Sequence, residues 1–358
     1  MRIVRAEGEG LARGTVIGKE LADLIGASIA FYHRYLEARG VSSEQLHDLL
    51  IRYLFAAEIA YPDAVAVLKG MAIGATVPVL ELFAINALEE LETLLESREG
   101  DVRTPTVAHR APVERCSSLT VRLPDTTLIA HNENWLAGDL GNVAVVIDRP
   151  EGGRVPIASP TIVACLPAVG LNAHGAGQGV DSLTSFDDGV GIPRVFVSRS
   201  SLDARDRADA IARAAMPGRA GGYAYVFGFP DDACIVETSG REHRVMNHAG
   251  PHTNHYLDPE LATLAPRPSE GSVARLGRLR ELLAERQPTT PEDLMDIMRD
   301  HGSVPQAICL HPDPAEGEEA SAVLFSMVAD VAARRMWVTA GNPCESDFEE
   351  IDLTELTD

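Results

Sequence analysis

The sequence pattern of this 358-residue chain changes from helical to strand-like spacing of apolar residues within one stretch, Ala111-Pro-Val-Glu-Arg115-Cys116-Ser-Ser-Leu-Thr120. Before Cys116 the apolar residues recur at helical spacing, and after it short apolar or alternating runs are separated by turns such as Pro124-Asp125. The change predicts a helical segment over residues 1–115 and a strand-rich segment over residues 116–358, joined in one integrated fold. A break of this kind at a cysteine also suggests that a functional chain begins at Cys116.

The spacing of the apolar residues predicts the individual elements. Helices are expected over 27–40, 46–60, 64–72, 79–97, 199–215, 272–286 and 291–299. Strands are expected over 117–123, 127–135, 142–148, 161–168, 223–228, 233–238, 243–247, 307–310, 322–328 and 336–339. The acidic run from Glu89 to Glu96 is interpreted as a solvated helix face, and 98–114 as an exposed linker. Runs of strands, then helices, then strands predict an α+β fold of antiparallel sheets flanked by helices.

The charge balance is strongly acidic, with 53 Asp and Glu against 31 Lys and Arg and a net charge of −22. Phosphate binding needs clustered Lys and Arg, so nucleic acid and anionic membranes are not expected as partners. No stretch approaches the roughly 20 consecutive apolar residues of a membrane span. The start of the chain lacks the apolar run of a secretory signal, and a cytoplasmic location is therefore expected.

The cysteines and histidines give no sign of a disulfide framework or a metal site. The five cysteines include no CxxC pair and stand at positions 116, 165, 234, 309 and 344. An odd, widely spaced set of this kind fits a reducing compartment. His131, His174 and His248 lack metal-ligand spacing and are interpreted as strand-end residues. We therefore expect no metal, and core positions for the cysteines at 165, 234 and 309.

Cys116 has two interpretations. An isolated cysteine is usually a buried, inert core residue. A cysteine freed as a new N-terminus, in contrast, has its own base, because its α-amine has a pKa of about 7.7–8.0 and is held at a fixed distance from the thiol. Such an amine can take the proton of a thiol whose ordinary pKa is about 8.5, as in enzymes with an N-terminal threonine.

Six segments, in their order along the chain, resemble the acyl-CoA:6-aminopenicillanic acid acyltransferase family, also called peptidase family C45. They are Arg115-Cys116-Ser-Ser, Ala130-His-Asn-Glu-Asn-Trp135, Gly170-Leu-Asn-Ala-His-Gly175, Gly191-Ile-Pro193, His252-Thr-Asn-His255 and Gly341-Asn-Pro-Cys-Glu-Ser346. The helical segment adds Leu68-Lys-Gly-Met-Ala-Ile-Gly-Ala75 and Asn86-Ala-Leu-Glu-Glu90. Each motif alone is weakly specific, whereas six in the family's order are a strong signal for the fold.

The resemblance implies the four-layer αββα sandwich of the N-terminal nucleophile hydrolases. It also implies an inactive precursor that cleaves itself between Arg115 and Cys116, leaving fragments 1–115 and 116–358 that stay associated. Cys116 would be the nucleophile and Asn254 would help to stabilise the oxyanion. Without the resemblance, Asn254 is equally well interpreted as a turn residue. The implied substrate is a small-molecule acyl amide or amine, with no cofactor, and with acyl-CoA as a co-substrate if the reaction is a transfer.

Asn134 departs from the family pattern. It stands eighteen residues after Cys116, where the family usually has an acid. An amide can hydrogen-bond the terminal amine but supplies no charge to hold an ammonium. Glu133 is expected on the opposite face of the strand, and Asp139 could reach back from the next turn. Arg115 also differs, since the family often has glycine before the nucleophile.

The resulting hypothesis is a self-processing N-terminal-cysteine amidohydrolase or N-acyltransferase with Cys116, Asn134 and Asn254 in its site. The alternative, which Asn134 supports, is an unprocessed family member that acts as a binding protein. Three hydroxyl residues that are expected to follow a strand either line an acyl pocket or belong to a plain loop; they are Ser182, Thr184 and Ser185.

Overall fold

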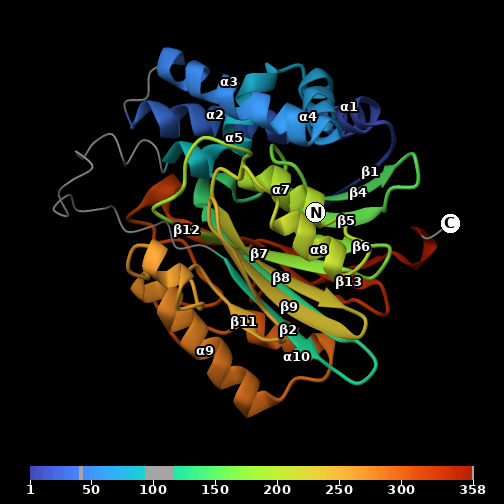
Figure 1. Cartoon of the computed structure of the whole chain (residues 1–358), viewed down its shortest axis with the longest axis vertical. Helices are drawn as coiled ribbons and strands as arrows, with labels where there is room; N and C mark the ends of the chain where they lie inside the picture. Colours follow the sequence, from blue (N-terminus) through green and yellow to red (C-terminus); the bar gives the residue numbers. More distant parts are fainter. Residues whose placement is uncertain (40–42, 93–115, 357–358) are drawn as a thin grey trace.

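Two β-sheets stacked face to face, with helices on both outer faces, form the centre of the molecule (Figure 1). The computed structural model describes residues 1–39, 43–92 and 116–356. This arrangement confirms the predicted α+β fold with helical outer layers. Arg115 and the linker predicted over 98–114 lie outside the described residues.

Within the described residues the larger sheet has eight strands and the smaller sheet six. In spatial order the larger sheet contains β1 (Arg2–Gly8), β4 (Val143–Pro150), β5 (Ile157–Ile162), β6 (Gly170–Asn172), β7 (Gly177–Leu183), β8 (Gly222–Phe229), β9 (Asp232–Thr238) and β10 (His243–Met246). The smaller sheet contains β11 (Pro251–His252), β2 (Ser117–Arg122), β3 (Thr127–Leu136), β12 (Ser321–Asp330), β13 (Arg335–Ala340) and β14 (Glu349–Asp352). Apart from β1 and β4, neighbouring strands pair antiparallel, as predicted.

Helices cover each sheet from outside. The larger sheet is covered by α1 (Gly10–Glu20), α2 (Ala22–Glu37), α3 (Ser43–Ala60), α4 (Pro62–Ala75), α5 (Val79–Asn86), α7 (Arg194–Ser201) and α8 (Arg207–Ala214). The smaller sheet is covered by α9 (Glu270–Arg286) and α10 (Pro291–Met298). Between the sheets, Ile129 and Met327 share one apolar core with Val145 and Leu171. Among the described residues, no helix combines the length and apolar character that crossing a membrane requires.

The segment before Cys116 is not wholly helical, because its first residues form the strand β1. Val4 and Ala6 are buried while their neighbours along the strand are exposed, and Arg2 pairs in parallel with Ala144 of β4. The prediction missed this strand because its partner lies far along the sequence and leaves no local signal. The parallel pair adds an edge strand to the larger sheet under α1 (Figure 1).

Other predicted elements were wrong in extent or type, and one of them is the helix expected over 79–97, because α5 ends at Asn86. The helix expected over 199–215 is divided into α7 and α8, because Asp206 begins a new helix by accepting a hydrogen bond from the Asp209 backbone N–H. The strand expected over 161–168 ends at Ile162. Residues 307–310 form no strand and belong to an irregular segment between α10 and β12.

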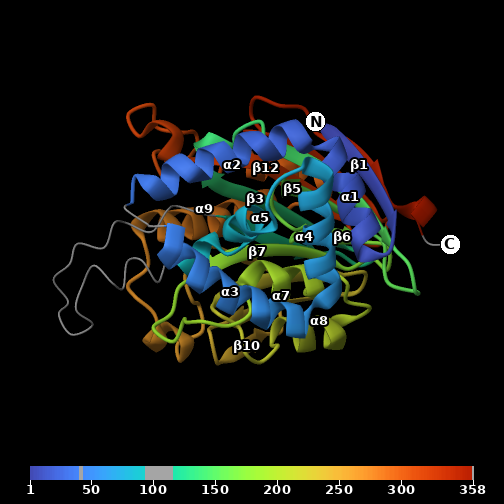
Figure 2. The ribbon, with the colours of Figure 1, turned by 90° about the horizontal axis from the view of Figure 1, so that it is seen from above.

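Glycines let α1 and α4 pack with their backbones in close contact, as seen from above in Figure 2. A Cβ atom on Gly14 would stand 1.9 Å from the Val67 carbonyl oxygen, and one on Gly18 would stand 2.1 Å from the Met71 carbonyl oxygen. Gly70 of α4 faces α1 in the same way. Neither carbonyl is free to move, because each belongs to the backbone of a packed helix.

We predict that Gly14→Ala destabilises the protein by about 1–3 kcal/mol, the usual cost of overpacking a tight interface. The matched control is Gly26→Ala on the exposed side of α2, where a Cβ meets nothing within 4 Å. This control should gain about 0.5–1 kcal/mol, because alanine is the better helix former. Urea unfolding measures both, and a stabilising Gly14→Ala would contradict the close packing of α1 and α4.

Candidate active site

The pairing of β2 with β3 fixes the position of Cys116. Ser117 pairs with Asn132, so Cys116, one residue before β2, lies opposite Glu133. The thiol donates a hydrogen bond to Glu133 Oε1 over 3.3 Å. Cys116 is only 3% exposed, so this contact is shielded from solvent.

The Cys116–Glu133 contact continues into a hydrogen-bonded chain. The second carboxylate oxygen of Glu133 lies 3.0 Å from His131 Nε2, and His131 Nδ1 lies 2.9 Å from Ser118 Oγ. Strand alternation places these side chains on one face of the smaller sheet, the face toward the larger sheet. Gly179 of β7 makes room for them, since a Cβ atom there would stand 2.9 Å from Ser118 Oγ. His131 therefore belongs to the site and is not a strand-end residue.

The same groups have a spacing that a metal ion would accept. Ligand atoms of Cys116, His131 and Glu133 lie within 4.8 Å of one another. In this structure hydrogen bonds already join the carboxylate to both the thiol and the imidazole. We therefore interpret the three side chains as a hydrogen-bonded network around the thiol.

Burial and two carboxylates keep the Cys116 thiol protonated. Burial raises the pKa of Cys116 well above its ordinary value, and the charges of Glu133 and Asp181 raise it further. The backbone N–H of Asn134, which hydrogen-bonds the sulfur, acts in the opposite direction. In the uncut chain the thiol is therefore a poor nucleophile at neutral pH, and a positive charge beside it would be needed to form the thiolate.

Arg275 of α9 joins the backbone of Cys116 to Asn254. Its guanidinium donates to the Cys116 carbonyl oxygen, to Ser117 Oγ at 2.8 Å and to Asn254 Oδ1 at 3.0 Å. Asn254 Nδ2 in turn donates to the Ser182 carbonyl oxygen at 3.3 Å. The structure thus brings Asn254 into the network around Cys116. It also adds Arg275, a buried cation that the sequence analysis did not single out.

The structure shows which of Glu133, Asn134 and Asp139 stands next to the Cys116 thiol. Asn134 is fully buried, and strand alternation turns its side chain to the face of β3 opposite Glu133. Asp139 does not reach back to the site, because its carboxylate accepts hydrogen bonds from Ser28 and Tyr32. Glu133 lies on the face of β3 opposite Asn134, as expected from sequence. That face, however, is the one that contains the Cys116 thiol. Glu133 is therefore the acid next to Cys116.

A cavity beside α5 opens onto the thiol. Cys116, Glu133 and Ser182 contribute polar atoms to its wall. The rest of the wall is mainly apolar and includes Ile85, Leu88, Trp135, Val180, Tyr223 and Phe325. Cys165, predicted in the core, is only partly buried and lines the same cavity. Of the three hydroxyl residues considered from sequence, Ser182 lines the cavity and the other two do not.

Two acids from the segment before Cys116 close the cavity. Glu89 accepts a hydrogen bond from Ser182 Oγ, and Glu90 accepts one from the Arg194 backbone N–H at 3.0 Å. The Arg194 side chain forms ion pairs with both carboxylates. Burial raises the pKa of Glu90 to about 7, while Arg194 acts in the opposite direction. The interpretation of these two acids as a solvated helix face was wrong, because their charges are paired inside the protein.

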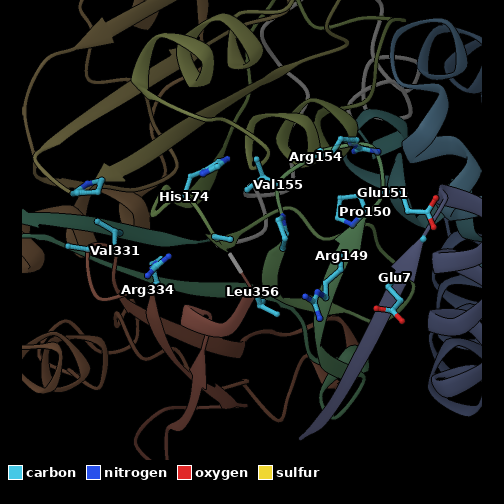
Figure 3. Close-up of a pocket in the computed structure, with 16 residues that line it drawn as sticks. Glu7, Arg149, Pro150, Glu151, Arg154, Val155, His174, Val331, Arg334 and Leu356 are labelled. Atoms are coloured by element: carbon cyan, nitrogen blue, oxygen red, sulfur yellow. The ribbon is translucent and has the colours of Figure 1, made fainter. Parts of the chain in front are cut away.

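A separate cavity of about 880 Å³ is lined by the ends of β1 and β4 and by the turn after β12 (Figure 3). Its labelled wall residues include Glu7, Arg149, His174, Arg334 and Leu356. It contains neither Cys116 nor any residue of the network around the thiol. The candidate site is therefore the cavity at Cys116, where a thiol, carboxylates and hydrogen-bond donors converge.

His252 of β11 is buried between two carboxylates. His252 Nε2 lies 2.8 Å from Glu237 Oε1, and its Nδ1 lies 3.4 Å from Asp181 Oδ2. Burial alone would lower the pKa of His252, but Asp181 and Glu237 raise it to about 9. The imidazole is therefore charged at neutral pH. The Asp181 carboxylate therefore acts on two groups, because it pairs with His252 and raises the pKa of the Cys116 thiol.

Comparison with known proteins decides the family. The sequence profile of the acyl-coenzyme A:6-aminopenicillanic acid acyl-transferase family matches residues 121–345, more than half of the chain. The chain belongs to this family. The match covers Glu133, Asn134, Asn254 and Arg275, and membership makes the chain an enzyme of the N-terminal nucleophile hydrolase type.

Solved structures of low sequence identity are also similar. Penicillin V acylase from Agrobacterium tumefaciens is 14% identical with a TM-score of 0.46, over 67% of this chain and 87% of that chain. Two variants of conjugated bile acid hydrolase from Clostridium perfringens are 10% and 12% identical, each with a TM-score of 0.43, over 67% of this chain and 93% of theirs. No curated protein sequence matches the chain. Family membership therefore rests on the family profile.

The charged state of His252 predicts a pH dependence of stability. Its pKa of about 9 in the folded chain exceeds the ordinary 6.5 of an exposed histidine. Its stabilising contribution is therefore complete below pH 6.5 and is lost as the pH rises through 9, by up to about 3 kcal/mol. Urea unfolding at pH 6 and pH 9 measures this loss, in a Cys116→Ala background that keeps the chain in one piece. His252→Gln should remove most of the decline in this window, and the part that remains is expected from Glu90, whose pKa of about 7 is also raised by burial. An unchanged slope would contradict the buried charge.

Proposed function

We propose that this chain is the precursor of an enzyme whose nucleophile is the thiol of an N-terminal Cys116. The mature enzyme would hydrolyse an acyl amide or transfer the acyl group to an amine. The observation that carries the proposal is the position of Cys116 just before β2, with its thiol in the cavity wall against Glu133 and its carbonyl oxygen bound by Arg275. Cleavage between Arg115 and Cys116 would turn the Cys116 peptide nitrogen into an α-amine beside this thiol.

The charges around Cys116 support a released amine. Glu133 and Asp181 make the electrostatic field at the sulfur negative, and both raise the pKa of the thiol in the uncut chain. An α-ammonium at Cys116 would place a positive charge against these carboxylates and lower the thiol pKa. Glu133 and Asp181 would then supply the negative charge that the amide of Asn134 lacks. Asn134 would keep a hydrogen-bonding role through its backbone N–H.

The reaction follows from these positions. The α-amine takes the thiol proton, and the Cys116 sulfur attacks the acyl carbonyl carbon. Asn254 Nδ2, which now donates to the Ser182 carbonyl oxygen, would turn its hydrogen bond to the oxyanion. The ammonium then protonates the leaving amine, and the acyl group stays on sulfur as a thioester. Water or a second amine, deprotonated by the same α-amine, removes the acyl group and restores the thiol.

The cavity wall supports an acyl group as the part of the substrate that enters. Its mainly apolar lining with a few polar atoms suits a hydrocarbon or aromatic acyl chain. An acyl amide and an acyl-CoA thioester would give the same acyl-cysteine, so both are accepted as donors in this proposal. Water in the site after the first amine leaves favours hydrolysis, and a bound second amine favours transfer.

A second candidate function is binding without catalysis. The thiol of the uncut chain is held protonated by its surroundings, and Asn134 brings no charge to the site. A chain that never cleaves would therefore keep an unreactive Cys116 and could only bind small molecules in the cavity. Cleavage separates the two candidates.

The first test of the function is self-cleavage. We expect purified protein to consist of fragments 1–115 and 116–358, which migrate together in native conditions because Glu89 is hydrogen-bonded to β7 and Glu90 to α7. Intact-mass spectrometry measures the fragments. Cys116→Ala should remain one chain, and Cys234→Ala, at a buried cysteine outside the cavity, should cleave like wild type. Wild-type protein that stays uncut yet turns over an acyl amide would refute the processing step.

The second test concerns the oxyanion. Asn254→Ala should lower turnover of an N-acyl amide by about 10²–10³, the usual loss for one oxyanion donor. Rates are compared per mole of fragment 116–358, so that incomplete cleavage does not count as slow catalysis. Asn247→Ala, at an exposed asparagine, is the matched control. Equal turnover in Asn254→Ala and wild type would exclude Asn254 as an oxyanion donor.

A further inference from the structure

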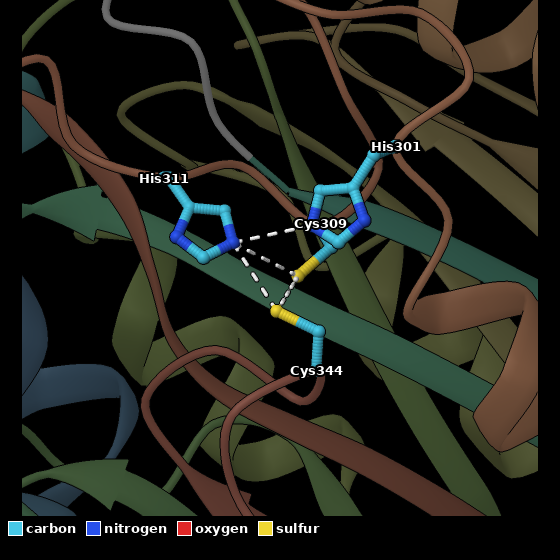
Figure 4. A group of neighbouring side chains, drawn as sticks. All are labelled: His301, Cys309, His311 and Cys344. Atoms are coloured by element: carbon cyan, nitrogen blue, oxygen red, sulfur yellow. Dashed lines mark hydrogen bonds between the residues drawn. The ribbon is translucent and has the colours of Figure 1, made fainter.

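Four side chains outside the candidate active site converge on one point (Figure 4). His301 follows α10, Cys309 and His311 belong to the irregular segment between α10 and β12, and Cys344 lies in the turn after β13. Each offers one ligand atom, and all four atoms lie within 4.8 Å of one another. Cys309 is buried, while the other three are exposed.

The distances between these atoms match the edges of a tetrahedral site. His301 Nε2 and His311 Nε2 are 3.1 Å apart, and the two sulfur atoms are 3.5 Å apart. His311 Nε2 lies 3.2 Å from Cys344 Sγ and 3.9 Å from Cys309 Sγ. A tetrahedral zinc ion with Zn–S of about 2.3 Å and Zn–N of about 2.0–2.1 Å has ligand-to-ligand edges of about 3.3–3.8 Å. These four of the six edges lie within a few tenths of an ångström of that range, and the two from His301 to the sulfur atoms are at most 4.8 Å.

Groups behind the four ligands are also those of a metal site. The Glu345 carboxylate lies 3.8 Å from His311 Nδ1, the ring nitrogen that faces away from the cluster. Metal-bound histidines usually direct this second nitrogen toward a carboxylate or carbonyl, which fixes the ring. Asn342 Nδ2 lies 3.4 Å from Cys309 Sγ and donates to the Leu310 carbonyl oxygen at 2.8 Å. An N–H donor directed at the sulfur stabilises a thiolate, the form that binds a metal.

We propose that His301, Cys309, His311 and Cys344 bind one Zn²⁺ ion. Two thiolates and two imidazoles in a tetrahedron form a set typical of zinc, and four protein ligands leave no open position, as in structural sites. On binding, the Cys309 and Cys344 thiols release their protons. A Cys309–Cys344 disulfide would use the sulfur atoms but would give the two histidines no reason to face each other and both thiols.

The ion would hold a segment that has little regular structure of its own. The end of α10 and the segment that follows it pack on the side of β3 away from the thiol, where Asn132 Nδ2 donates to the Met298 and Ile308 carbonyl oxygens at 3.0 Å each. Asn132 neighbours Glu133 along β3 and pairs with Ser117. The zinc site would therefore stabilise the side of the β2–β3 pair that faces away from the thiol, and this pair positions Cys116. The inference stands whether or not Cys116 is released as a nucleophile.

Metal content tests the proposal directly. Full-length protein expressed in zinc-supplemented medium and purified with reductant should contain one zinc per chain by inductively coupled plasma mass spectrometry. Protein stripped with a chelator and given Co²⁺ should show thiolate-to-cobalt charge-transfer bands and the visible bands of tetrahedral cobalt. Cys344→Ser changes an exposed ligand and should reduce the zinc content to near zero after dialysis. Cys234→Ala, at a buried cysteine outside the cluster, should keep it.

Alkylation provides a readout that does not depend on metal analysis. Cys344 is exposed, so in metal-free protein it should react readily with iodoacetamide. In zinc-loaded protein it should be protected, and a chelator should restore labelling at the peptide that contains it. Wild-type protein without zinc and without a cobalt spectrum would overturn the proposal. Equal zinc in wild type and Cys344→Ser, or a Cys309–Cys344 disulfide in reduced preparations, would overturn it as well.

Discussion

The pairing of β2 with β3 is the constraint on which the rest of the site depends. It sets Cys116 opposite Glu133 at the point where β2 begins, and Gly179 of the larger sheet lies over the next residues of the network, Ser118 and His131. A flexible loop could not hold a thiol against a carboxylate in so little space. Because the strand begins directly after Cys116, a cut before this residue would leave the paired strand in place. The thiol would then stay where the uncut chain has put it.

A dry, negatively charged environment gives this position its chemistry. Burial and two carboxylates raise the pKa of the Cys116 thiol, so the sulfur of the uncut chain keeps its proton and is unreactive. Two positive groups nearby already have partners. His252 lies between Asp181 and Glu237, and Arg275 binds the Cys116 carbonyl oxygen. An ammonium created at Cys116 itself would be the charge that changes the thiol. Activation and cleavage would then be one event, which fits an enzyme made as an inactive precursor.

The sequence predicted those parts of the site that have local signals. Cys116 stands where the spacing of apolar residues changes from helical to strand-like, and Asn254 lies in a motif of the family. Arg275 could not be found this way, because its helix contains several arginines and only the tertiary packing shows which one is buried. Asp181 had a usable signal, since it is the charged residue of an otherwise uncharged strand.

The fold shows the same division between local and distant signals. Strands with alternating residues and capped helices were predicted from sequence, whereas β1 was missed because it pairs with a strand distant in sequence. Glu89 and Glu90 looked like a solvated helix face because their partner Arg194 lies about a hundred residues away. The four residues of the proposed zinc site were missed for a related reason. Their spacing from His301 to Cys344 matches no short motif, and only the tertiary fold brings them together.

The site of acylation tests the central claim, that Cys116 is the nucleophile, most directly. Protein is incubated with an acyl substrate, quenched in acid and digested, and the acyl mass is located by peptide mapping. The account predicts the acyl group on the peptide whose first residue is Cys116, bound to sulfur as a thioester that hydroxylamine removes. Cys165 lines the same cavity and is the internal control. Acylation of Cys165, with an unmodified Cys116 in turning-over protein, would contradict the account.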